Sequence, residues 1–197
     1  MSGFVIFKYS STMYKIIILS ILLVLIAGCQ QKESSNDVPD VVSQQTKGFF
    51  SNLKTFCGDE FFGKIEYPNQ SGHQLTGSET KLVFDDCLED SISIKFYLNQ
   101  IHTMDWTITK AKEVGLNLLF YHPDNSGLPD GVDSYNGVSN PDGTDIVQYF
   151  IPTQQTIQDF PEIARNKWIL KLDTINNTLT YMLFRADDLR FKAIYQK

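Results

Sequence analysis

The fold is decided by the stretch Ser91-Ile92-Ser93-Ile94-Lys95-Phe96-Tyr97-Leu98, in which apolar and polar side chains alternate. Successive side chains of an extended strand point to opposite faces, so a period of two residues gives one apolar face and one polar face. The stretch therefore predicts a β-strand whose apolar face is buried.

The same alternation recurs on both sides of this stretch. Its apolar positions are Leu82 and Phe84; Met104, Trp106 and Ile108; Leu116, Leu118 and Phe120; Trp168, Leu170 and Leu172; Leu179, Tyr181 and Leu183; and Leu189, Phe191 and Ala193. Residues 146–151 add a less regular candidate, and short turn-forming segments separate the runs. Helix signals are confined to residues 156–166 and to the end of the polar segment 30–48. We expect an all-β antiparallel meander that closes into a lipocalin-like up-and-down barrel, with a two-sheet sandwich as the alternative.

Length and charge limit the possible classes of protein. The chain has 197 residues, of which 42% are apolar, and its formal net charge is −6. This length accommodates one domain and an extension. Nucleic acid is excluded as a partner because phosphate binding requires a cluster of basic residues that a surplus of carboxylates would repel.

The amino terminus reads as a targeting signal. Met13-Tyr14-Lys15 precedes an apolar run that ends near Ile26, and small residues follow. A run of about 11 residues is too short to cross a bilayer core of about 30 Å as a helix. Ile26-Ala27-Gly28-Cys29 resembles the lipobox of bacterial lipoproteins, which implies that cleavage precedes Cys29 and that its sulfur carries a lipid. Because Gln30 rather than aspartate follows, the resemblance favours the outer membrane, with the protein facing the periplasm.

These features divide the chain into three parts. Residues 1–28 are the expected signal peptide, whose true start is Met13 if the first codons are not used. Residues 29–48 contain many Gln, Ser, Asn and Asp and few large apolar side chains, so we expect a flexible lipidated tether. Residues 49–197 carry the aromatic side chains at the density of a folded domain and form the single β domain.

Cys57 and Cys87 remain once Cys29 carries lipid. An even pair of cysteines in an oxidising compartment usually forms a disulfide, so we predict a bridge between them. A reactive cysteine paired with a histidine is the alternative.

The segment from His122 to Asp145 is long, rich in turn formers and free of an obvious strand pattern. Segments of this kind in a small domain are usually functional or disordered. Its oxygen-bearing side chains are of the type that Ca²⁺ binds, although their spacing matches no calcium loop. A solvated loop without a ligand is the simpler interpretation. The candidate ligand-site residues are His122, Asp124, Asp130, Asp133 and Tyr135.

Several short motifs together resemble an uncharacterised family of small secreted or lipid-anchored bacterial proteins. They are Phe56-Cys57-Gly58, Phe62-Gly63-Lys64, the acidic cluster around Cys87, Asp105-Trp106-Thr107-Ile108-Thr109, Gly115-Leu116 and the segment from His122 through Tyr135 to Gly143-Thr144. The resemblance covers residues 55–195. It implies no activity, and this chain has fewer loop histidines than the family pattern, which weakens a metal site built from several of them.

Three hypotheses for function remain open. The first is a non-enzymatic binding module, in which an interior lined by Trp106, Phe120, Trp168 and Tyr181 holds an apolar small molecule, or the acidic loop meets an envelope partner. The second is a structural or interaction lipoprotein without a pocket. The third is an envelope hydrolase that uses His122 and a loop carboxylate. No cofactor other than Ca²⁺ is suggested.

Overall fold

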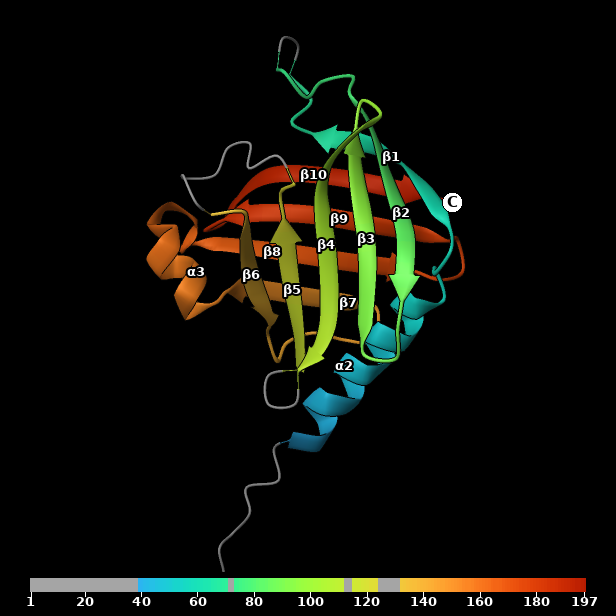
Figure 1. Cartoon of the computed structure of the whole chain (residues 1–197), viewed down its shortest axis with the longest axis vertical. Helices are drawn as coiled ribbons and strands as arrows, with labels where there is room; N and C mark the ends of the chain where they lie inside the picture. Colours follow the sequence, from blue (N-terminus) through green and yellow to red (C-terminus); the bar gives the residue numbers. More distant parts are fainter. Residues whose placement is uncertain (1–38, 71–72, 112–114, 124–131) are drawn as a thin grey trace, which may run out of the picture. The chain divides into compact units, whose positions relative to one another are not determined.

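The computed structural model describes residues 39–70, 73–111, 115–123 and 132–197. Its strands form a closed antiparallel barrel in which each strand pairs with its neighbours in sequence (Figure 1). The first strand pairs with both the second and the last, so no edge is left within the sheet. The predicted all-β up-and-down barrel is therefore confirmed, and the two-sheet alternative is not.

The described elements follow one another along the chain. They are α2 (Pro39–Lys54), β1 (Glu60–Tyr67), β2 (Glu79–Cys87), β3 (Ser91–Leu98), β4 (Ile101–Ala111), β5 (Gly115–Tyr121), β6 (Ser134–Ser139), β7 (Val147–Pro152), α3 (Gln154–Asp159), the 3₁₀ helix η1 (Pro161–Ile163), β8 (Asn166–Asp173), β9 (Thr178–Arg185) and β10 (Asp188–Gln196). Helix α3 and η1 lie in the region where the sequence predicted a helix.

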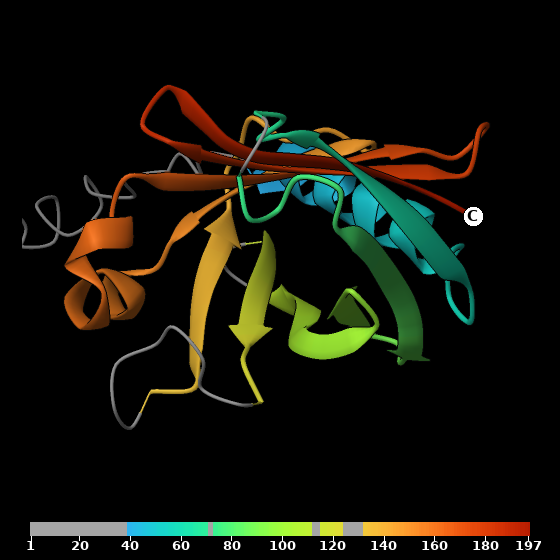
Figure 2. The same ribbon diagram turned by 90° about the horizontal axis from the view of Figure 1, so that it is seen from above.

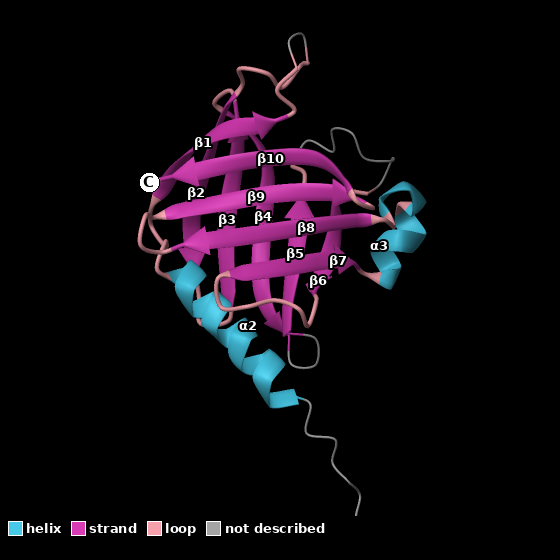
Figure 3. Ribbon diagram, turned by 180° about the vertical axis from the view of Figure 1, so that it is seen from behind, coloured by secondary structure: helices cyan, strands magenta, loops and turns pink. Residues whose placement is uncertain are grey.

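The barrel has two distinct ends. Strands β8–β10 form one layer and β2–β6 lie on the other side, with the strands of the two groups crossing (Figures 2 and 3). Helix α2 lies at the end where β2 finishes and β3 begins, which we name the α2 end. The opposite end, where β3 finishes and β4 begins, is named the distal end.

Helix α2 closes the α2 end because one of its faces is apolar. Phe49, Phe50, Leu53 and Phe56 are buried at helical spacing around the helix C-terminus and join the barrel core. The side-chain amide of Asn52 donates a hydrogen bond of 2.8 Å to the backbone carbonyl oxygen of Asp145, which lies just before β7. The helix therefore supplies apolar side chains to the part of the barrel that it covers.

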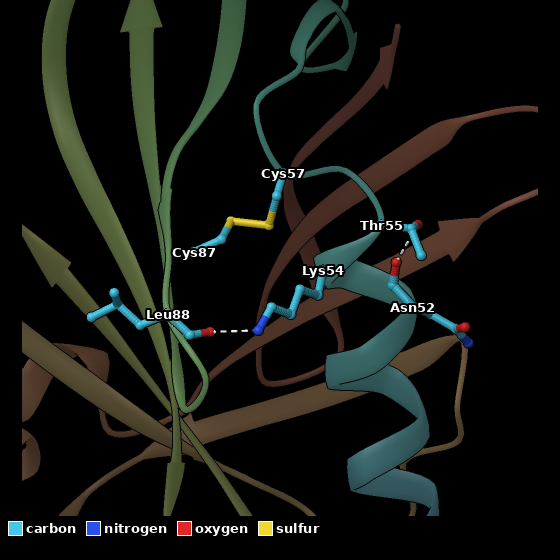
Figure 4. The surroundings of a disulfide bond; sticks show 6 residues. All are labelled: Asn52, Lys54, Thr55, Cys57, Cys87 and Leu88. Atoms are coloured by element: carbon cyan, nitrogen blue, oxygen red, sulfur yellow. Dashed lines mark hydrogen bonds between the residues drawn. A yellow bond between two sulfur atoms is a disulfide. The ribbon is translucent and has the colours of Figure 1, made fainter.

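A disulfide joins this helix to the sheet. Cys57 follows α2, Cys87 ends β2, and their Cα atoms lie 6.1 Å apart (Figure 4). The Lys54 ammonium donates a hydrogen bond of 2.8 Å to the carbonyl oxygen of Leu88, just beyond the bridge. The predicted bridge is confirmed, and Cys57 lies in the turn after α2.

Two glycines allow large aromatic rings to lie against neighbouring strands. A Cβ at Gly63 of β1 would overlap the Thr80 hydroxyl and the Tyr195 ring, which belong to its two partner strands. A Cβ at Gly137 of β6 would approach the Trp168 ring to 2.9 Å. Both glycines therefore provide space that any other residue would fill.

Three details of the secondary structure differ from the sequence prediction. Strand β6 lies inside the segment 122–145, where the sequence shows no strand pattern, and it pairs with β5 and β7. Helix α2 lies where the sequence showed helix signals, at the end of the polar segment, but it begins at Pro39 and buries Thr46, so the last part of the expected flexible tether is helical. In β10 a bulge separates Leu189 from Phe191, and Leu189 pairs with Phe184 instead of sharing the inner face.

Candidate functional site

The centre of the barrel is filled by aromatic rings. Trp106, Phe120, Trp168 and Tyr181, which the sequence predicted to line the interior, are all buried. Their ring centroids lie close together, at 4.7 Å for Trp106 and Tyr181 and at 5.2 Å for Phe120 and Trp168. These residues therefore pack against one another in the middle of the barrel.

Towards the distal end, the inward-facing apolar side chains are no longer fully covered. Phe96 of β3 pairs across the strands with Met104 of β4, and Phe191 of β10 pairs with Leu183 of β9. All four pack against the core but remain partly accessible. Their equivalents nearer α2, such as Ile92, are completely buried. The distal end therefore presents apolar surface inside the strand ring.

A continuous row of rings links the two sides of this end. Phe96 stacks on Trp106 with 5.7 Å between centroids, Trp106 contacts Tyr181, and Tyr181 lies 5.7 Å from Phe191. Trp106 and Tyr181 are the more deeply buried pair, whereas Phe96 and Phe191 are partly accessible. We name Phe96, Met104, Leu183 and Phe191 the distal apolar group.

Polar atoms are buried among these rings. The Trp106 Nε1 has no hydrogen-bond acceptor among the described residues, although its side chain is fully buried. Burial raises the pKa of the Tyr181 phenol well above its usual value, and the nearby phenols of Tyr135 and Tyr195 add to the increase. A buried N–H without an acceptor costs about 1–3 kcal/mol, and such a group in a native structure requires an explanation.

The structure brings together only part of the predicted loop site. His122 and Tyr135 face each other, with 5.6 Å between ring centroids, and the His122 amide donates to the Asp133 carbonyl oxygen over 2.7 Å. The Asp133 carboxylate is exposed and accepts a hydrogen bond from the Ser134 hydroxyl. Asp124 and Asp130 lie outside the described residues.

Tyr135 belongs to the aromatic core and is not a loop residue. It lies on β6, where its ring stacks on Trp168 and lies 5.0 Å from the Phe120 centroid. Burial raises the pKa of its phenol to about 12. This phenol is therefore neutral at physiological pH and can donate or accept a hydrogen bond, but it does not supply an anionic ligand. Within the described parts of the chain, no three metal-ligating side chains gather into one group.

One histidine has a carboxylate partner that the sequence analysis missed. His102 lies on β4 with its Nε2 2.8 Å from the Asp105 Oδ1. Residues three apart normally face opposite sides of a strand. Here the pairing of β3 with β4 shifts at Thr103, so both side chains reach the outer face. Only the position of this bulge would have revealed the pair.

No family model, curated protein or solved structure gives a significant match to this chain. Among the described residues no helix has the length and apolar character needed to span a membrane.

Proposed function

We propose that this chain is a lipid-anchored binding protein of the cell envelope, and that an apolar small molecule binds at the distal end of its barrel. The anchor in this proposal is Cys29, which lies outside the described residues. The lipobox-like sequence around Cys29 and the disulfide between Cys57 and Cys87, a bond typical of oxidising compartments, support a position in the envelope. Gln30 favours the outer membrane.

The observation that carries the binding proposal is the difference between the two ends of the barrel. At the α2 end, the apolar face of a helix covers the interior, and the side chains there are fully buried. At the distal end, the four side chains of the distal apolar group remain accessible inside the strand ring. Apolar side chains on the inside of a barrel gain free energy when a ligand removes them from water, at about 25 cal/mol per Å².

The buried Trp106 indole indicates which polar group the proposed ligand should carry. The Trp106 ring stacks on Phe96 of the distal apolar group, and its Nε1 is buried without an acceptor among the described residues. An acceptor atom on the ligand would satisfy this donor and recover the cost of leaving it unpaired. The preferred ligand is thus a mainly apolar molecule with one oxygen acceptor at the end that enters first.

This proposal is tested by titrating the protein with N-phenyl-1-naphthylamine, an apolar dye whose fluorescence increases on leaving water. We expect saturable binding that weakens at least about tenfold in the double variant Phe96→Ala and Phe191→Ala. Ile151→Ala is the matched control, because Ile151 is an apolar residue that is 42% exposed and, as the neighbour of the buried Phe150 in β7, faces the outside of the barrel.

Two results would oppose the proposal. A wild-type protein that does not bind the dye would favour a structural or interaction lipoprotein without a ligand. Equal weakening by the control variant would place the dye on the outer surface of the barrel.

A further inference from the structure

A concave site lies on the outside of the barrel, separate from the distal apolar group. It has a volume of about 350 Å³ and is lined by Phe62, Glu79, Thr80, Lys81, Tyr97 and Gln100. This volume falls within the range of small-molecule sites, about 300–1,000 Å³. We name it the outer groove.

The outer groove is built on a row of side chains that crosses three strands. Phe62 of β1 pairs with Lys81 of β2, and Lys81 pairs with Tyr97 of β3. Directly opposed residues share a face of the sheet, so the three side chains stand side by side. The row faces outwards because the flanking residues Phe61 and Leu82 are buried in the core.

The turn between β3 and β4 fixes one wall of the groove. Asn99 and Gln100 both have positive φ angles, 49° and 69°, which fold the chain into a tight hairpin. The backbone N–H of Asn99 donates to the Glu79 carbonyl oxygen over 2.8 Å. The backbone N–H of Glu79 donates to the side-chain Oδ1 of Asn99 over 3.0 Å. This pair of bonds holds Gln100 and Glu79 at the same site.

Of the two charged side chains in the groove, Lys81 has an oppositely charged partner and Glu79 has none among the described residues. The Lys81 ammonium lies 3.0 Å from the Glu60 carboxylate and 5.0 Å from the centre of the Tyr97 ring. Glu79 is opposite Lys64 in the strand register, but within the described residues no basic group lies within salt-bridge distance of its carboxylate. Glu79 is exposed and remains available as a hydrogen-bond acceptor.

Phe62 supplies the apolar surface of the groove. Its side chain is 63% exposed and stands at the β1 end of the three-strand row. Phe62 lines a concavity that also holds polar side chains, and such a combination of apolar surface with a few polar groups is typical of small-molecule sites. The partner must therefore have a flat apolar face together with several hydroxyl or amide groups at its edge.

We propose that the outer groove binds a saccharide. The apolar C–H face of a sugar ring would lie on Phe62, and the hydroxyl groups at its edge would donate to the Glu79 carboxylate and accept from Lys81 and Gln100. The Tyr97 phenol contributes a further donor or acceptor. A saccharide fits better than a compact cation, since the Lys81 ammonium already lies over the Tyr97 ring. This site does not depend on the proposed function of the distal end.

The test is isothermal titration of the full chain, in a detergent without a sugar headgroup, with two probes, triacetylchitotriose and maltotriose. We expect saturable binding of at least one probe. Phe62→Ala and Tyr97→Ala should each weaken it at least about tenfold. Tyr121→Ala is the matched control, because Tyr121 is an exposed aromatic residue on the outer face that does not line the groove, and we expect its affinity to remain within about twofold of wild type.

Three outcomes would overturn the proposal. The first is that neither saccharide binds. The second is that saccharide binding is unchanged in Phe62→Ala and Tyr97→Ala. The third is that choline, titrated as a separate probe, binds when neither saccharide does and loses its affinity in Glu79→Gln. The last outcome would identify the groove as a site for ammonium groups. Phe62 and Tyr97 lie on the surface, so correct folding of each variant can be verified by its circular dichroism and its urea midpoint.

Discussion

The disulfide permits a prediction whose magnitude follows from the structure. Cys57 and Cys87 are 30 residues apart in sequence, and the bridge between them limits the unfolded chain. The loop-entropy relation for a loop of this length gives about 3.6 kcal/mol of stabilisation at 25 °C. Because folded domains are stable by only about 5–15 kcal/mol, this is a large fraction of the total.

The perturbation is the double variant Cys57→Ala and Cys87→Ala, which removes the bridge without leaving a free thiol. In urea unfolding monitored by tryptophan fluorescence, the free energy of unfolding of this variant should be about 3–4 kcal/mol lower than that of the oxidised wild-type protein. Reduction of the wild-type protein serves as the control and should give a similar loss. A loss below about 1 kcal/mol in both would refute the reasoning, because it would mean that the loop is already restricted in the unfolded state.

Three further predictions concern the core and the buried phenol. Leu53→Ala should lower the free energy of unfolding by about 2–5 kcal/mol in urea titrations, since Leu53 is fully buried; a loss near zero would show that α2 does not cover the barrel. Gly63→Ala should cost about 1–3 kcal/mol in the same assay, because its Cβ would overlap the Tyr195 ring, and an unchanged midpoint would contradict this packing. Tyr135 has a pKa of about 12 in the folded chain and near 10 when unfolded, so it stabilises the fold fully below pH 10 and loses this contribution as the pH rises towards 12. Thermal melts between pH 9 and 12 should therefore show a smaller decrease in Tm for Tyr135→Phe than for wild type, and equal decreases would contradict the burial of this phenol.

The strands with regular alternation were predictable because only one face of each strand is buried in the core. In residues 91–98 the inner positions Ile92 and Ile94 are buried and the positions between them are not, as the sequence pattern requires. The disulfide was predictable for a different reason, because Cys57 and Cys87 are the two cysteines left when Cys29 is assigned to the lipobox-like sequence. Local patterns therefore determined most of the fold.

The features that were missed depend on contacts between distant residues. Strand β6 has weak strand formers at Asn136 and Gly137, and its glycine is required because the Trp168 ring, far away in sequence, lies against it. Helix α2 follows a polar segment, so composition obscured where the apolar face begins. No local pattern could show that Thr46 would be buried.

The candidate sites were predictable only in part. The alternation placed the distal apolar group on the inner face, but it could not show that helix α2 would cover only the opposite end. The bulge at Thr103, which brings His102 beside Asp105, and the three-strand row of the outer groove are consequences of strand register. Register is set by the closed barrel and not by any one strand.

The most direct test of the central claim, that the distal end binds an apolar small molecule, is native mass spectrometry of the chain from Gln30 onward. This form lacks the proposed anchor and would be exported to the periplasm and purified without detergent. We predict a mass excess of small-molecule size that disappears on denaturation and is absent from the double variant Phe96→Ala and Phe191→Ala. The bare chain mass, less two hydrogens for the disulfide, in every charge state of the wild-type protein would contradict the claim.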